Sequence, residues 1–240
     1  MKYFNRDSSL YDVEKMLERE FVNNPRIRIV GDMEIDHDDY NFLNEKLRDV
    51  RSQYGNLQII DRYRLCQILG WVGYLKFENP DRIYLANRQA LSKKLPQHVA
   101  GQFLQMFSDA FCEYGFKTGD ISDISFDGLC QVVALQAGMH REEYSTMYEI
   151  LRAHKSLTIP RLYDEQIFRQ VSYRMGEIFK YLNKETHMLV IRTICDVYVD
   201  ARYNDLSVLE IMNRKPDASY VLIDTFVQRA YEERRDKGFI

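Results

Sequence analysis

The chain has 240 residues, of which 45% are apolar and 29% charged, so it is long enough for one or two domains that bury a substantial core. This composition excludes an intrinsically disordered chain, which would be poorer in apolar residues. The formal charge of −3, from 33 basic and 36 acidic residues, does not favour non-specific binding of nucleic acid, which requires positive charge gathered on one face.

The first part of the chain predicts a helix, a short strand and a second helix. Ser9 precedes an amphipathic apolar stripe, with Asp12 at the capping-box position three residues later, which predicts a helix that ends before Pro25. The segment RIRIV at 26–30 alternates charged and aliphatic residues, as a half-buried strand does. A second helical pattern runs over 38–55.

A third helix and a β-hairpin are predicted next. The apolar segment over 59–71 favours a helix, and the segment YLKFENPDRIYLA at 74–86 has two alternating runs around an Asn-Pro-Asp turn, which favours a hairpin. The order helix, strand, helix, helix, hairpin resembles a winged-helix domain, in which the third helix enters a DNA groove and the hairpin is the wing. We therefore predict a winged-helix-like α+β unit over residues 1–95.

Residues 96–240 predict an all-helical bundle, so the fold class is mainly α with a small hairpin. One-sided apolar stripes run over 99–111, 167–182 and 221–231. The segment HMLVIRTICDVYV at 187–199 is apolar nearly all round, which predicts a central helix surrounded by its neighbours.

The segment VVALQAGMHREEYSTM at 132–147 has the spacing of a helix-turn-helix. Ala134 lets two helices approach, Gly138 supplies the turn, and Met139 packs between the helices. Arg141 on the second helix could contact DNA, but the neighbouring Glu142 and two further glutamates would repel phosphates. A pair of core helices joined by a glycine turn explains the same residues, and both interpretations remain open.

The acidic segment over 32–39 invites a calcium interpretation. An EF-hand loop that began at Asp32 would need Gly where His37 stands and Glu where Leu43 stands. We therefore interpret the segment as a solvated acidic loop that caps the next helix.

A second acidic group could serve a metal-dependent enzyme or act as acid and base. Asp196 and Asp200 share one helix face, and Asp205 follows them. The same carboxylates could instead pair with Arg192 and cap the next helix. The five histidines have no zinc-binding spacing, and phosphate-loop and dinucleotide fingerprints are absent, so no metal or other cofactor is predicted.

Basic residues gather around the predicted third helix and wing, with Tyr63, Trp71, Tyr74 and Tyr84 interleaved. This mixture suits phosphate contact with stacking, and it suits a protein interface rich in Tyr and Arg equally well. The candidate residues for binding nucleic acid or a partner are these basic residues together with the one on the second helix of the 132–147 pair: Arg62, Arg64, Lys76, Arg82, Arg88 and Arg141.

Three functional hypotheses follow. The chain is a non-enzymatic binding module, most testably for double-stranded DNA, or a helical protein-protein interaction subunit of a larger assembly, or a metal-dependent enzyme built on the acidic groups. The four widely spaced cysteines are expected to be buried thiols of a cytoplasmic protein. Neither a signal peptide nor an apolar run of about 18 residues is present, so we expect no membrane span.

Overall fold

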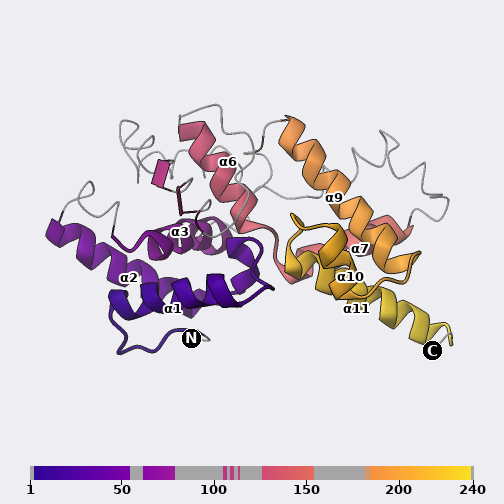
Figure 1. Ribbon diagram of the computed structural model, residues 1–240, viewed down its shortest axis with the longest axis horizontal. Coiled ribbons are helices and arrows are strands. Elements are labelled where there is room, and N and C mark those ends of the chain that lie inside the picture. Colours follow the sequence, from indigo (N-terminus) through magenta and orange to yellow (C-terminus); the bar gives the residue numbers. More distant parts are fainter. Residues whose placement is uncertain are drawn as a thin grey trace. The chain divides into compact units, whose positions relative to one another are not determined.

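The computed structural model describes residues 3–54, 62–78, 126–153 and 184–238, with six isolated positions between them. It divides into two compact units at Gly138 (Figure 1), apart from a short piece at 180–182 that joins the first unit. Each unit is described by itself. The predicted boundary at 95/96 falls in a segment outside the described residues and stays a prediction.

The first unit is built around α3, which packs against α1, α2 and α6. Nearly every residue of α3 is buried, because apolar side chains occupy all its faces and Gly73 admits the ring of Tyr40. A Cβ at Gly73 would lie 2.5 Å from that ring. The elements of this unit are α1 (Leu10–Asn23), η1 (Val30–Met33), α2 (His37–Tyr54), α3 (Arg64–Gly73), η2 (Tyr74–Glu78) and α6 (Phe126–Ala137).

Helix α1 begins and packs as predicted. The Ser9 hydroxyl accepts from the Asp12 N–H, and the Asp12 carboxylate accepts from the Ser9 N–H at 3.0 Å, which completes the capping box. Leu10, Leu17 and Phe21 are among the residues of the buried stripe. The opposite face of α1, which includes Tyr11, is exposed to solvent.

The strand predicted at 26–30 is wrong. The backbone N–H groups of Arg28 and Ile29 donate to the Asp32 carboxylate at 3.0 and 3.1 Å, so they are not available to a neighbouring strand. Ile27 and Val30 are the buried members of the segment, at the spacing of a turn, and the chain continues into η1.

The hairpin predicted over 74–86 is also wrong in its first strand, and the rest of that segment lies outside the described residues. Tyr74 has helical backbone angles at the end of α3, and the chain continues as a π-helix through Glu78. No strand occurs in the described parts of the chain, so the winged-helix-like fold class is wrong. What the structure describes is mainly helical.

The second unit packs α11 against α7 and α9. Its core contains an aromatic cluster in which Tyr148 lies 5.2 Å from Tyr198 and 5.5 Å from Phe226, between ring centroids in edge-on geometry. Its elements are α7 (Arg141–Ala153), α9 (Lys184–Arg202), α10 (Val208–Arg214) and α11 (Tyr220–Asp236) (Figure 1). The helix predicted at 221–231 is confirmed by α11.

The central helix predicted at 187–199 is buried in its second half only. Ile191 is 2% exposed, and the residues on its side down to Tyr198 are also buried. Leu189, however, is 63% exposed, so the expectation of burial all round is wrong for the first turns of α9. Among the described helices, none is long and apolar enough to cross a membrane.

Candidate functional site

A groove lies between the outer face of α1 and the turn that starts α3, both in the first unit. Its volume is about 350 Å³. We call it the α1–α3 groove. It is lined by Tyr11, Glu14, Lys15, Glu18, Arg62, Tyr63, Arg64 and Leu65.

One side of the α1–α3 groove is the solvent-facing stripe of α1. Tyr11, Lys15 and Glu18 are spaced four and three residues apart, which places their side chains on one helix face. Lys15 Nζ lies 2.6 Å from the Glu18 carboxylate and 5.9 Å from the centre of the Tyr11 ring. The hydrogen bond to Glu18 raises the pKa of Lys15, so the ammonium stays charged. Tyr11 is 59% exposed, so its ring is accessible from solvent.

The other side is the turn over 62–65, which two side chains hold in place. The two Glu14 carboxylate oxygens accept from the backbone N–H groups of Leu65 and Cys66, each at 2.9 Å. Helix α3 has no side-chain cap from its own N-cap residue, so Glu14 of α1 supplies the cap. The buried Gln67 side chain donates to the carbonyl of Arg62 at 2.8 Å.

Tyr63 in this turn has a left-handed backbone conformation. Its φ of 54° and ψ of 44° cost a residue with a Cβ roughly 1 kcal/mol. The hydrogen bond from the Gln67 N–H to the Tyr63 carbonyl, with the Glu14 cap, holds the conformation against that cost. Strained residues of this kind cluster at functional sites, and Tyr63 and the following Arg64 both line the groove.

Positive charge exceeds negative charge in the α1–α3 groove by one. Lys15, Arg62 and Arg64 are cationic, whereas Glu14 and Glu18 are anionic. The Glu14 charge faces the N-terminal end of α3, where the helix dipole is positive. Arg64 also forms a solvent-exposed ion pair with Glu113, at 2.9 Å.

The other predicted site residues that the structure describes do not line this groove. Lys76 is only 6% exposed, and its Nζ donates to the Gly31 carbonyl at 3.3 Å, so its ammonium is not presented at the surface. Arg141 belongs to the second unit, where it pairs with Asp224 at 2.6 Å. Arg82 and Arg88 lie outside the described residues.

Of the six predicted residues, Arg62 and Arg64 are therefore the two that the structure brings together. Sequence reasoning missed the contribution of α1, which comes from Tyr11, Glu14 and Lys15. The signal was available in part, because the capping box and apolar stripe identify α1 and thereby its exposed face. Which element that face borders is decided by tertiary packing.

The predicted helix pair at 132–147 forms with the expected glycine turn. Gly138 has a φ of 58°, which a residue with a Cβ rarely adopts. Tyr144, a bulky side chain at an interior position, is buried, and its hydroxyl accepts from the Met139 N–H at 3.3 Å. Helix α6 packs with α3 in the first unit, and α7 packs with α11 in the second. This packing supports the interpretation as core helices joined by a glycine.

The acidic segment at 32–39 satisfies backbone groups. The Asp39 carboxylate is fully buried and accepts from the N–H groups of Tyr3 and Phe4 at 3.1 Å, while the Asp32 carboxylate is buried and caps the turn before η1. The expectation of a solvated loop is wrong for these two side chains. A carboxylate whose oxygens accept backbone hydrogen bonds is poorly placed to bind an ion.

The second acidic group pairs with basic residues of α10, α11 and the turn after α10. Asp196 lies 2.5 Å from Lys215, Asp200 lies 3.4 Å from Arg214, and Asp205 pairs with Arg234. Three carboxylates with three different cations do not converge on one point. Within the described ranges, no three side chains of the types that bind metals come together as a metal site would require.

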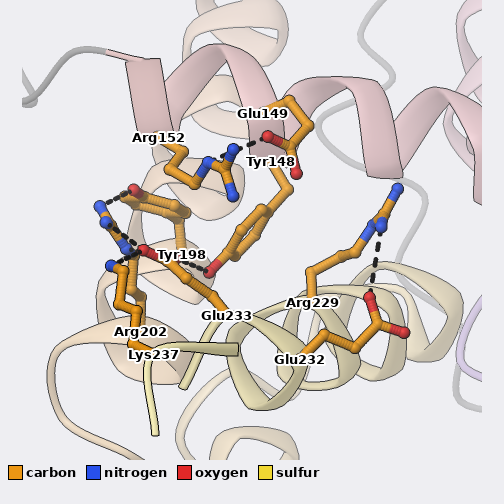
Figure 2. A network of polar contacts seen from close by, with 9 residues as sticks. All are labelled: Tyr148, Glu149, Arg152, Tyr198, Arg202, Arg229, Glu232, Glu233 and Lys237. Carbon is orange, nitrogen blue, oxygen red and sulfur yellow. Dashed lines mark hydrogen bonds and ion pairs between the residues drawn. The ribbon is translucent and has the colours of Figure 1, made fainter. Parts of the chain in front are cut away.

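A buried polar cluster in the second unit joins α7, α9 and α11 (Figure 2). Arg202 donates from two nitrogens to the Glu233 carboxylate at 3.0 and 2.8 Å, and the Tyr148 hydroxyl and Lys237 ammonium donate to it at 3.0 and 2.5 Å. Burial raises the pKa of Glu233, but the hydrogen bonds from Arg202, Lys237 and Tyr148 outweigh burial and hold it at about 2. Burial raises the pKa of Tyr148 above its usual value.

This cluster is not poised for proton transfer near neutral pH. Glu233 remains ionised there, and the elevated pKa keeps Tyr148 protonated, whereas a general acid or base works best with a pKa near the operating pH. The thiols are equally unreactive: burial raises the pKa of Cys66 and brings that of Cys195 to about 12. The side chains of Cys112 and Cys130 lie outside the described residues.

The chain was compared with protein families, curated proteins and solved structures. No protein-family model matches the chain, no curated protein matches it, and no solved structure matches it. Function must therefore be argued from the residues themselves.

Proposed function

We propose that the chain is a non-enzymatic helical module that binds a protein partner through the α1–α3 groove. The observation that carries the proposal is the groove itself, in which a turn that contains Tyr63 and two arginines is held by Glu14 and Gln67 and lies beside Tyr11. Tyr and Arg are enriched at protein interfaces, and pre-organised contacts bind with less loss of conformational entropy.

Carboxylates in and beside the groove favour a protein over DNA. Glu18 lies in the groove beside Lys15, and Glu113 lies against Arg64. DNA presents a continuous row of phosphates, so a duplex on these arginines would bring several negative charges close to both glutamates, and each repulsion would reduce affinity. A protein can place a single carboxylate on the arginines and uncharged or basic groups near the glutamates. A protein surface can present charges of both signs and match the mixture.

The carboxylate groups that would support the enzyme hypothesis have other roles. Asp32 and Asp39 accept backbone hydrogen bonds, and Asp196, Asp200 and Asp205 form ion pairs. The structure therefore supports metal-dependent chemistry less well than binding.

Site-specific crosslinking tests the proposal. A benzoylphenylalanine placed at Tyr11 in the full chain, in the cells that make it, should form an adduct with one defined protein on irradiation. The adduct should be lost when Arg62→Glu is added. The control position is Tyr231, an exposed aromatic of α11 in the second unit. The partner, identified by mass spectrometry and purified, should bind the wild type more tightly than Arg62→Ala; equal binding would contradict the proposal.

DNA binding is the competing outcome, and fluorescence anisotropy with duplex DNA at several salt concentrations detects it. Salt-dependent binding that is lost in Arg62→Ala/Arg64→Ala and kept in Arg141→Ala would replace the protein partner with nucleic acid. Each phosphate contact removed should lower the salt slope by about one unit. We expect no such binding.

A further inference from the structure

We infer that the α1–α3 groove takes a short acidic segment of the partner, with a carboxylate on Arg62 and Arg64 and a neighbouring apolar or aromatic side chain against Tyr11 and Tyr63. The inference rests on the proposed function and specifies the chemistry of the partner.

Charge complementarity is the first argument. The two carboxylates in the groove already have close partners, since Glu14 accepts two backbone N–H groups of α3 and Glu18 accepts from Lys15. The arginines at 62 and 64 stand on either side of Tyr63, and the lining has a net charge of +1, which Glu113 beside Arg64 offsets until a ligand displaces it. A guanidinium presents a planar fork that matches a carboxylate, so an acidic side chain is the complementary group.

Glu113 provides the second argument, because its carboxylate already contacts Arg64 within the chain itself. Its carboxylate oxygen lies 2.9 Å from Arg64, and both side chains are substantially exposed. An exposed ion pair of this kind contributes only about 0–1 kcal/mol. A carboxylate from the partner can therefore replace Glu113 at little cost and adopt a geometry that Arg64 already accepts.

The size of the groove limits the segment to a few residues. The face of α1 from Tyr11 to Glu18 is seven residue steps long, or roughly 10 Å at the rise of an α-helix. That length corresponds to about three steps of extended peptide. A volume of about 350 Å³ accommodates a small number of side chains. The groove thus fits a short linear motif.

The fixed turn supplies the third argument. The cap from Glu14 and the Gln67 hydrogen bond order the turn before any ligand arrives, and they hold Tyr63 in its left-handed conformation. Glu14 is in this sense a positioning residue, which acts on a ligand through the backbone of Leu65 and Cys66. A motif of three or four residues can bind such a surface specifically because little of the protein has to be ordered on binding.

Selection from a library of random short peptides displayed on phage tests this inference on the full chain. Peptides selected on the wild type should be enriched in Asp and Glu over the starting library. Synthetic peptides from the selection should lose about 10- to 100-fold in affinity on Arg62→Ala/Arg64→Ala, the loss expected for charge-assisted hydrogen bonds. Arg62→Lys/Arg64→Lys should restore part of the affinity, because charge is kept and the fork is lost.

Matched controls separate this inference from the proposed function. Arg229→Ala removes a partly exposed arginine of the second unit that pairs with Glu232 (Figure 2), and it should leave peptide affinity unchanged. Selected peptides in which every Asp and Glu is replaced by Asn and Gln should no longer bind.

Each other outcome is decisive. Peptides that depend on Arg62 and Arg64 but bind equally well as their amide versions would overturn the acidic motif and leave the proposed function intact. Selection of no peptide would overturn the acidic motif. Peptides that bind the wild type and the double variant alike, together with no Arg62-dependent crosslink at Tyr11, would overturn both.

Discussion

Replacing Glu14 with alanine removes the only side chain seen to cap α3, and the cost can be worked from the structure. Two charge-assisted hydrogen bonds of 2.9 Å are lost, to the N–H groups of Leu65 and Cys66, and both bonds are partly buried beside the groove, where water can substitute in part. Each such bond contributes about 1.5–3 kcal/mol, and alanine returns a few tenths through its higher helix propensity. The full loss would be about 3–6 kcal/mol, and because water can replace part of the two bonds we expect Glu14→Ala to lower the free energy of unfolding by about 2–4 kcal/mol.

Trp71 makes the measurement specific to the first unit. It is the only tryptophan of the chain, and it is buried in α3, so its fluorescence during urea unfolding reports on the helix that Glu14 caps. Glu18→Ala is the matched control: it changes the same residue type on the same helix, but removes an exposed pair with Lys15 worth about 0–0.5 kcal/mol. Equal losses for the two variants would refute the reasoning, since the cap would then contribute no more than a surface ion pair.

Three further predictions concern the rest of the chain. The pKa of Glu233 is held at about 2 in the folded state against 4.5 in the unfolded state, so its contribution to stability is present above about pH 4.5 and is lost as the pH falls towards 2. The loss is on the order of 3 kcal/mol. An acid titration followed by circular dichroism should therefore show a shallower decline in stability for Glu233→Gln than for the wild type. Ile191→Asp should cost about 3 kcal/mol or more by burying a charge, whereas Leu189→Asp should cost less than about 0.5 kcal/mol; similar thermal midpoints for the two would contradict the observed burial. Calcium should give no heat in titration calorimetry, because the Asp32 carboxylate is engaged with backbone N–H groups; micromolar affinity that disappears in Asp32→Asn would reverse this assignment.

The elements that could be predicted from sequence are those whose signals are local. Helix α1 was found from a capping box that spans Ser9 to Asp12, and the turn at Gly138 from the left-handed conformation that glycine permits. In both places the interacting groups lie within a few residues of one another. No long-range packing is needed to decide the outcome.

The strand predicted at 26–30 and the first strand of the predicted hairpin failed because a period of two over a few residues is weak evidence. In the segment 26–30 the competing interaction is the reach of the Asp32 carboxylate back to two backbone N–H groups, which produces a turn. Gly31 then passes so close to the end of α6 that a Cβ would lie 1.9 Å from the Ala137 carbonyl oxygen. That contact joins positions more than a hundred residues apart, and no local pattern encodes it.

The dependence on long-range packing also explains why the turn residues of the groove were predicted and the α1 residues were not. Arg62 and Arg64 could be selected because basic residues gather around the predicted third helix, but Lys76 was grouped with them on the assumption of an exposed wing. The helical continuation from α3 instead buries Lys76 against Gly31. Glu14 could not be associated with this site, since its cap joins residues 51 and 52 positions apart.

Overall charge is a poor guide to what this groove binds, because charge is distributed by internal use. The formal charge of −3 does not favour non-specific binding of nucleic acid, but it does not describe any one surface. Asp32 and Asp39 accept hydrogen bonds from backbone N–H groups, and Glu233 is paired with Arg202 and Lys237. The two cations at Glu233 cancel its negative potential at a distance, whereas Asp32 and Asp39 keep their charge. At short range the charges that line the groove matter more than the formal charge of the chain, so a lining with an excess of one cation can attract an acidic segment.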